Sequence, residues 1–187
     1  GGFVALLGSS INNAGQIVAP EGQVALAAGD TVELALTDSG LLGIKVDVAS
    51  AGAQIENSGF IAADGGRVWM TARQAAPMIA TAINQTGVVR ANSVNQRNGE
   101  IWLDAGPNGK VELAGSIQAQ GQLAGTTGGK IVATGHTVEV SGSIDASGSA
   151  GGGEMYVGGG WQGKDPAIAE ASRVYLQETA SLLADAR

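Results

Sequence analysis

The chain has 187 residues, with ten Lys and Arg against 17 Asp and Glu, and a formal net charge of −7. This acidic balance, without any basic cluster, argues against nucleic acid and anionic membrane surfaces as partners. The sequence has no cysteine for disulfides or zinc ligation, and no run of about 18 apolar residues to span a bilayer. Its 31 glycines and 4% aromatic residues are typical of a slender all-β interior.

One short phrase recurs along most of the chain. Each copy alternates apolar and polar residues, and most copies continue through a small residue and a glycine into a second apolar segment. Successive copies begin 21, 23, 28, 28, 27 and 36 residues apart, which indicates a solenoid of stacked units. The copies are 11–17, 32–36, 55–61, 83–89, 111–117, 138–144 and 174–176.

Two further kinds of apolar-x-apolar segment flank these phrases, one following a glycine and the other ending on a small residue. Period-two alternation bounded by Gly, Asn, Asp and Ser indicates short β-strands. Three strands per repeat predict one triangular coil, and therefore an all-β, right-handed parallel β-helix of about seven coils. The flanking segments are 4–6, 24–26, 68–70, 101–103, 131–133 and 155–157, and then 17–19, 61–63, 117–119 and 144–146.

The later intervals are longer than one coil requires, which predicts excursions from the helix. In the second excursion, Pro77 with the apolar residues after it predicts a short helix near 74–81. The unbroken repeat predicts a single β-helix domain over 1–187, as a piece of a longer polypeptide. We place the excursions at Thr37–Gly52, Ala72–Thr81, Gly121–Gly128 and Gly158–Ser172.

Isolated chemical motifs are weak in this chain. His136 is the only histidine, and nothing in the sequence places triad partners beside it. The segment Gly158–Lys164 has the Gly and Lys spacing of a phosphate loop, but Asp165 stands where Mg²⁺ coordination needs a hydroxyl. A glycine-rich solvent loop explains this segment better, and we expect no cofactor and no metal ion.

The dispersion of the aspartates bears on enzymatic function. Polysaccharide lyases and hydrolases built on β-helices need carboxylates clustered on one face. The aspartates here occur one per coil, in turns or on different walls, which favours a non-enzymatic protein. They are Asp30, Asp64, Asp104 and Asp145.

A set of glutamates is aligned rather than dispersed. Glu33, Glu112 and Glu139 occupy the same outward position of the recurring phrase. Glu112 and Glu139 belong to successive copies, so we expect them to stack directly, with mutual repulsion. They either recruit a cation or face solvent, and a solvated face is the usual situation of surface charge.

The middle residues of the glycine-preceded strands form an aromatic outward column. Strand alternation places Trp69 and Trp102 on the outer face of neighbouring coils, about 4.8 Å apart. Exposed indoles stack on sugar rings, so Trp69, Trp102 and Tyr156 are the candidate ligand-binding residues. The alternative is that the Ala72–Thr81 excursion folds back and covers them. The column is Ala5, Ala25, Trp69, Trp102, Val132 and Tyr156.

Several longer phrases carry a family resemblance. GGFVALLGSSINNAGQIVAPEGQVALAAGD opens the chain and is followed by NSGFIAADGGRVWMTARQAA, NQTGVVRANS and GSIDASGSAGGGEMYVGGG. In this order, over essentially the whole chain, they resemble filamentous haemagglutinin-type exoproteins, the large adhesins of two-partner secretion. The resemblance implies a right-handed β-helix passenger, exported through an outer-membrane transporter partner to the exterior of a Gram-negative cell. The Asn-Pro-Asn motifs of the family's secretion domain are missing.

This resemblance implies a non-enzymatic segment of a secreted or surface adhesin. Such a segment serves attachment to host cells, other bacteria or biofilm matrix, with a carbohydrate or cell-surface receptor as its ligand. The family supplies no catalytic residues here. Two alternatives stay open: a polysaccharide lyase or hydrolase on a β-helix, and a purely structural filament shaft without its own ligand.

Overall fold

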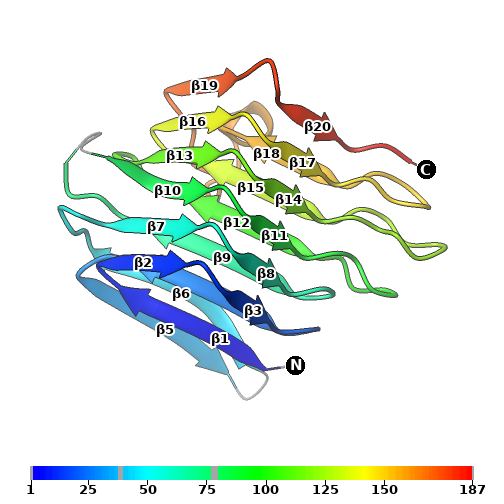
Figure 1. Ribbon diagram of the computed structural model, residues 1–187, viewed down its shortest axis with the longest axis horizontal. Coiled ribbons are helices and arrows are strands. Elements are labelled where there is room, and N and C mark those ends of the chain that lie inside the picture. The colour runs from blue at the N-terminus through cyan, green and yellow to red at the C-terminus, as the bar shows by residue number, and fades with distance from the viewer. Residues whose placement is uncertain (1, 38–39, 77–79, 187) are drawn as a thin grey trace.

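Short strands on three walls build the molecule, which the computed structural model describes for residues 2–37, 40–76 and 80–186. Each coil strand pairs in parallel with the equivalent strand of the neighbouring coil, so the coils stack into a rod (Figure 1). The prediction of an all-β parallel β-helix is confirmed.

Each wall is a six-stranded parallel sheet. The first wall contains β1 (Phe3–Gly8), β4 (Gln23–Ala28), β9 (Arg67–Ala72), β12 (Glu100–Asp104), β15 (Lys130–Thr134) and β18 (Glu154–Val157). The second wall contains β2 (Ser10–Asn13), β7 (Gln54–Asn57), β10 (Thr81–Gln85), β13 (Lys110–Leu113), β16 (Thr137–Val140) and β19 (Arg173–Leu176). The third wall contains β3 (Gln16–Val18), β8 (Phe60–Ala62), β11 (Val88–Arg90), β14 (Ser116–Gln118), β17 (Ser143–Asp145) and β20 (Ser181–Leu183).

Alternating burial explains why these short segments form strands. In β12 the side chains of Ile101 and Leu103 are fully buried, whereas Trp102 between them points outward and is half-buried. A strand with a period of two can therefore fill the interior with every second residue. The third wall ends on a small buried residue, as predicted, because the interior narrows at that corner. These residues include Ala63, Ala91, Ala119 and Ala146.

Glycine forms the corner between the second and third walls. A Cβ at Gly87 would lie 2.1 Å from the carbonyl oxygen of Gly59 in the preceding coil. Gly115 and Gly142 approach the preceding coil equally closely. The glycine of the recurring phrase is therefore required by the stacking of the coils, since any side chain would separate them.

The rod has six coils in the described residues, rather than the seven that the repeat predicts. Residues 32–36 lie in β5 (Thr31–Thr37), which pairs antiparallel with β6 (Gly40–Val48) and forms no part of a wall. The first excursion consequently begins before the predicted Thr37. The seven-coil prediction is wrong because a hairpin strand and a coil strand share the same period of two.

The β5–β6 hairpin lies on the outer face of the first wall. The strand β6 contacts β4 and β9, and the outward-pointing Ala25 and Ala27 of β4 are fully buried. At the base of the hairpin, the backbone N–H of Asp30 donates to the carbonyl of Val48, at 2.9 Å. The hairpin therefore covers a part of the wall that a plain coil would leave open to solvent.

The other excursions lie where the sequence predicts them. They connect β9 to β10, β14 to β15 and β18 to β19, and the last contains a short 3₁₀ turn, η1 (Trp161–Gly163). The predicted helix near 74–81 is not found in the described part of that segment, because Gln74 forms a parallel bridge with Ser50. Residues 77–79 lie outside the described residues. No helix in the described part of the chain is long and apolar enough to cross a membrane.

Candidate functional site

The aromatic column of the first wall is in register along the rod, as predicted. Trp69 of β9 lies directly opposite Trp102 of β12. Val132 of β15 separates Trp102 from Tyr156 of β18, and Ala25 precedes Trp69 in β4. The structure therefore brings the two indoles together and keeps the phenol apart from them by one coil.

Two basic side chains lie over these rings. The guanidinium carbon of Arg67 lies 5.8 Å from the centroid of the Trp69 ring. The Lys130 Nζ atom lies 5.3 Å from the ring of Trp102 and 5.1 Å from that of Tyr156. Cations at such distances are attracted by the negative ring faces. Lys130 thus links Trp102 to Tyr156 across the coil between them.

The side chains of the three candidate aromatics are half-buried. Cover by the Ala72–Thr81 excursion stays a prediction, because residues 77–79 lie outside the described residues. Two other segments lie against the first wall: the strand β6 contacts β9, and the hydroxyl of Thr134 in β15 donates to the carbonyl of Ala169.

A row of polar and charged side chains runs beside the aromatic column, two positions earlier in each strand. Arg67 Nε lies 2.9 Å from Glu100 Oε2, and Lys130 Nζ lies 4.0 Å from Glu154 Oε2. The negative charge of Glu154 is the main cause that raises the pKa of Tyr156. The row is Gln23, Arg67, Glu100, Lys130 and Glu154.

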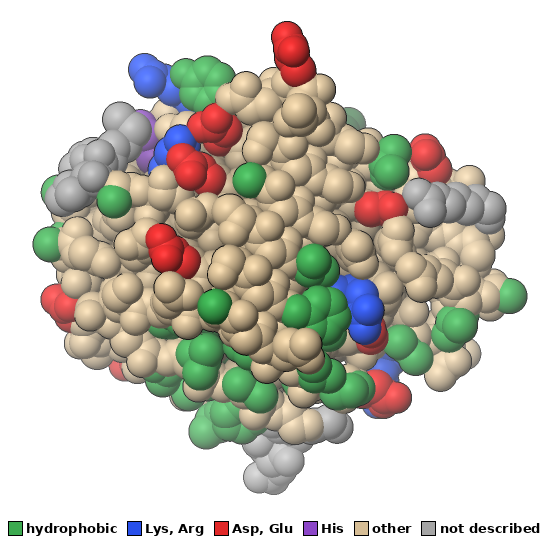
Figure 2. All heavy atoms as spheres, viewed as in Figure 1, with side chains coloured by type: hydrophobic (Ala, Val, Ile, Leu, Met, Phe, Trp, Pro, Cys, Tyr) green, Lys and Arg blue, Asp and Glu red, His purple; other side chains and the backbone are tan. Residues whose placement is uncertain are grey.

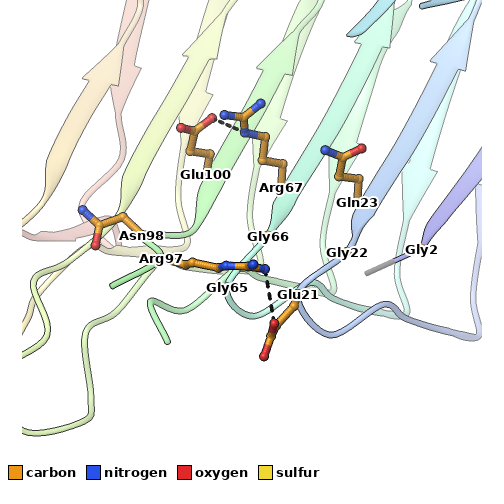
Figure 3. A pocket seen from close by; sticks show the side chains of 10 residues that line it. All are labelled: Gly2, Glu21, Gly22, Gln23, Gly65, Gly66, Arg67, Arg97, Asn98 and Glu100. Carbon is orange, nitrogen blue, oxygen red and sulfur yellow. Dashed lines mark hydrogen bonds and ion pairs between the residues drawn. The ribbon is translucent and has the colours of Figure 1, made fainter. Parts of the chain in front are cut away.

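This row forms one side of a groove at the corner where the third wall leads into the first. Figure 3 shows three members of this row, Gln23, Arg67 and Glu100, on one side of the glycines, and Arg97 reaching along the other side toward Glu21. Arg97 Nη1 lies 3.2 Å from Glu21 Oε2. Gly22 and Gly66 lie between the two sides, and this part of the groove has a volume of about 510 Å³.

A second part of the groove, of about 350 Å³, continues toward the C-terminal coils. It runs past Gly129 to Glu154, and it shares Asn98 and Glu100 with the first part. These residues belong to none of the sequence motifs that point to a site. The available signal was positional, since the row repeats two residues before the aromatic column in every strand from β4 to β18.

Asp30 and Asp64 follow strands of the same coil, β4 and β8, rather than lying one per coil as predicted, whereas Asp104 of β12 and Asp145 of β17 lie on two other coils. Asp64 accepts hydrogen bonds from Arg90 Nε, and Asp104 forms an ion pair with Arg73. The described residues contain no group of three or more His, Asp or Glu side chains that could hold a metal ion. Asp64 and Asp104 are thus engaged by arginine, on different strands, unlike the paired carboxylates that glycoside hydrolysis uses.

Lys110 lies between the aligned glutamates of the second wall. Its Nζ atom contacts Glu112 and lies 2.7 Å from Glu139 Oε2. These hydrogen bonds raise the pKa of Lys110, and the one to Glu139 lowers the pKa of that carboxyl. The prediction that Glu33 shares this column is wrong, because Glu33 lies on the hairpin opposite Lys45.

The glycine-rich loop after β18 does not present a free phosphate cradle. The N–H of Gly160 donates to Glu170 Oε1 at 3.0 Å, so a carboxylate already occupies an amide that a phosphate would need. His136 Nδ1 lies 3.5 Å from the hydroxyl of Ser172, at a turn contact between neighbouring coils.

Figure 2 shows the distribution of side chains on one face of the rod. Hydrophobic side chains gather at its lower edge, over β1 and the β5–β6 hairpin, while acidic side chains are scattered singly elsewhere. Exposed apolar side chains of these elements include Leu7 and Leu36. The apolar surface of this face is therefore concentrated at the N-terminal coil.

No protein-family model matches this chain, and no curated protein matches it. Among solved structures, the chain is similar to the crystal structure of the HMW1 secretion domain from Haemophilus influenzae, with a TM-score of 0.81 and 28% sequence identity. The match covers 98% of this chain and 48% of that chain, so this chain spans about half the length of the structure that it matches. The likeness supports the resemblance to secreted exoproteins at the level of a secretion domain.

Proposed function

We propose that this chain is a segment of a secreted passenger protein, exported by two-partner secretion through an outer-membrane transporter to the exterior of a Gram-negative cell. The observation that carries the proposal is the likeness to the HMW1 secretion domain along 98% of the chain. The segment is one β-helical domain, 1–187, of a longer exoprotein.

The stacking order of the coils supports export of this kind. In the walls, each strand pairs only with the equivalent strands of the adjacent coils. A repeat structure with neighbour-only contacts can form progressively from one end. A chain that emerges unfolded from a transporter can therefore fold coil by coil outside the cell.

The export proposal is tested by secretion of the parent protein from a Gram-negative host strain, with and without its outer-membrane transporter. The expected result is that the protein reaches the medium or the cell surface only when the transporter is present. Equal release without the transporter, or periplasmic retention in both strains, would contradict the proposal.

Within this passenger, the outer face of the first wall is the attachment surface. The support is the alignment of Trp69, Trp102 and Tyr156 on one outward column. Half-buried aromatic rings can stack on the apolar face of a sugar or pack against a protein receptor. The receptor belongs to host cells, other bacteria or biofilm matrix.

The attachment surface is tested with Trp102→Ala, using Trp161→Ala as the matched control. Trp161 is 76% exposed on the loop after β18, and it does not belong to the aromatic column. We expect Trp102→Ala to reduce adhesion of the purified chain to cells or biofilm about ten-fold, since aromatic anchors dominate binding surfaces. If Trp102→Ala lowers the melting temperature while adhesion per folded molecule stays unchanged, the column is structural.

The chain serves this role without catalysis. The support is the separation of Asp64 and Asp104, each engaged by an arginine. Incubation with pectin, alginate and related acidic glycans should yield neither new reducing ends nor unsaturated products. Turnover that is abolished by Asp104→Asn would establish the polysaccharide-degrading alternative instead. Failure to bind any cell or glycan, with normal export, would establish the structural shaft.

A further inference from the structure

We propose that the groove between the third and first walls binds a neutral oligosaccharide in an extended conformation, lying along the rod axis beside Trp69 and Trp102. This inference rests on the attachment surface proposed above. It adds the class of ligand and the groove residues that would bind it beside the aromatic column. Four features of the groove support it: its continuity, its floor, its charge balance and its polar side chains.

The groove is continuous along the rod. Its two parts share Asn98 and Glu100, and together they extend from Gly2 beside the first coil to Glu154 of the last. Neighbouring coils are separated by about 4.8 Å, so the lining repeats once per coil. A site that repeats at this spacing fits a polymer of repeating units better than a compact small molecule.

The floor of the groove is backbone that cannot carry side chains. A Cβ at Gly66 would lie 1.8 Å from the carbonyl oxygen of Gly22, and one at Gly153 would lie 2.0 Å from that of Gly129. The stacking of the coils therefore keeps the corner open.

The same backbone is already paired, which disfavours a peptide ligand. The N–H of Arg67 donates to the carbonyl of Gly22 at 3.1 Å, and that of Glu100 donates to Gly66 at 3.0 Å. Peptides that add to a sheet need an unpaired strand edge. A ligand in this groove must instead be recognised by the side chains on its two sides.

Those side chains are balanced in charge. Three basic groups face three carboxylates, and all six are engaged in ion pairs, so the groove offers no excess charge to a polyanion or a polycation. The protein as a whole carries a net charge of −7, which further disfavours sulfated or uronic acid polymers. The pairs are Arg67–Glu100, Arg97–Glu21 and Lys130–Glu154.

The remaining polar groups suit hydroxyls. Gln23 lines the groove, and its buried Oε1 atom has no hydrogen-bond partner among the described residues. Amide, guanidinium and carboxylate groups can each make two hydrogen bonds in one plane, which matches neighbouring hydroxyls of a sugar. Arg67 connects these groups to the aromatic column, since it also lies over Trp69.

The first experiment uses hexasaccharides of β-1,4-linked glucose, mannose and N-acetylglucosamine, the corresponding disaccharides, and a heparin hexasaccharide. Calorimetric titration of the chain should show that at least one neutral hexasaccharide binds about ten-fold or more tightly than its disaccharide, because only the longer probe spans several coils. In NMR spectra, that hexasaccharide should shift the indole N–H signals of Trp69 and Trp102 together with the amide signals of Gly22 and Gly66.

The second experiment removes one groove carboxylate. Glu100→Gln preserves the shape of the side chain but removes its charge and its pairing with Arg67, and Arg97→Ala removes the opposite side of the groove. Each should weaken the hexasaccharide by roughly five- to ten-fold. The matched control is Glu56→Gln, which lies on the outward side of the second wall and should change binding less than two-fold. Circular dichroism confirms that each variant is folded.

The outcomes separate this inference from the proposed function. If Trp102→Ala abolishes binding while Glu100→Gln and Arg97→Ala leave it unchanged, the attachment surface stands and the groove inference is overturned. Preference for the heparin hexasaccharide, or no binding to any neutral hexasaccharide, also overturns the groove inference. The secretion experiment is independent of these results and decides the export proposal by itself.

Discussion

Coils near the two ends of the second wall use the same inward position in opposite ways. The inward residue at the end of each strand is an amide in the N-terminal coils and aliphatic in the C-terminal ones. Asn13 Nδ2 donates to Asn57 Oδ1, and Asn57 Nδ2 donates to Gln85 Oε1, each at 2.7 Å. The column is Asn13, Asn57 and Gln85, and then Leu113, Val140 and Leu176, of which Leu176 in the last coil is 59% exposed.

The same inward position is thus stabilised in two ways, by hydrogen bonds between amides in the N-terminal coils and by aliphatic burial in the C-terminal coils. A buried amide is costly unless it is paired, so the amide ladder favours one register of the coils. An aliphatic column stabilises by burial and has no directional requirement. At the boundary, Gln85 Nε2 is buried and has no hydrogen-bond partner in the described part of the chain, because the next coil presents Leu113.

The outer face of the same wall also differs between the two regions. In the N-terminal coils, Asn12 donates a hydrogen bond to Glu56. In the C-terminal coils, Lys110 is paired with both Glu112 and Glu139. At this wall, the N-terminal coils therefore carry amides at the last inward position, while the C-terminal coils are aliphatic there and carry an ion-pair cluster on the outer face.

The largest loss of stability is expected from Asn57→Leu, in the middle of the amide ladder. This change leaves Asn13 Nδ2 and Gln85 Oε1 without their present partners. Two unpaired buried groups should lower the free energy of unfolding by about 4 kcal/mol, at about 1–3 kcal/mol each. Urea denaturation followed by circular dichroism measures the change. A loss smaller than about 1 kcal/mol would show that the ladder contributes little.

In the aliphatic region, Leu113→Ala should cost about 3 kcal/mol, because it removes buried surface and leaves a cavity. Leu113 is only 1% exposed. The control is Leu123→Ala, whose side chain is 51% exposed in the excursion after β14 and whose loss should change stability by less than about 0.5 kcal/mol. Equal midpoints for the two variants in urea would refute stabilisation by burial.

Gln85→Leu sharpens the comparison at the boundary of the two regions. It eliminates the unpaired Gln85 Nε2 but leaves Asn57 Nδ2 without its acceptor, so the number of unpaired amide groups is unchanged. The free energy of unfolding should therefore change by no more than about 1 kcal/mol. A loss as large as that of Asn57→Leu would mean that the ladder acts as one unit rather than as separate pairs.

The smallest effect concerns the outer ion pairs and depends on pH. The pKa of Glu139 is lowered in the folded state, so its contribution is present above its ordinary value of 4.5 and is lost as the pH falls through the lowered pKa. The pKa of Lys110 is raised in the folded state, so its contribution to stability is fully present below its ordinary value of 10.5 and is lost as the pH rises through the raised pKa. Both contributions are therefore present between these two values.

Lys110→Met should accordingly destabilise the chain most near neutral pH, by less than about 1 kcal/mol because the groups are partly exposed. The difference from the unchanged chain should shrink as the pH falls through the lowered pKa of Glu139, because that carboxyl then loses its charge. Thermal unfolding at pH 7 and at pH 3 measures this difference. A destabilisation that is equal at both values would assign it to the packing of the Lys110 side chain instead.

The sequence by itself determined the coil strands and their register. Period-two alternation identified the inward residues of the walls, and the register placed Trp69 opposite Trp102. The glycine of each phrase marked a corner, because the backbone of stacked coils approaches too closely there for any side chain, as at Gly87. The alternation and the glycine positions can each be read within one short segment of the sequence, without knowledge of the rest of the chain.

Only the tertiary structure decided which partner a strand takes and which charges meet. Residues 32–36 alternate like a coil strand, but they pair with β6, and this choice depends on a segment that follows later in the chain. The pairing of Lys110 with Glu139 and the groove at Gly22 and Gly66 likewise join residues from different coils. Such contacts form because neighbouring coils stack about 4.8 Å apart. The residues that meet in this way are far apart in the sequence, so their spacing along the chain does not identify them.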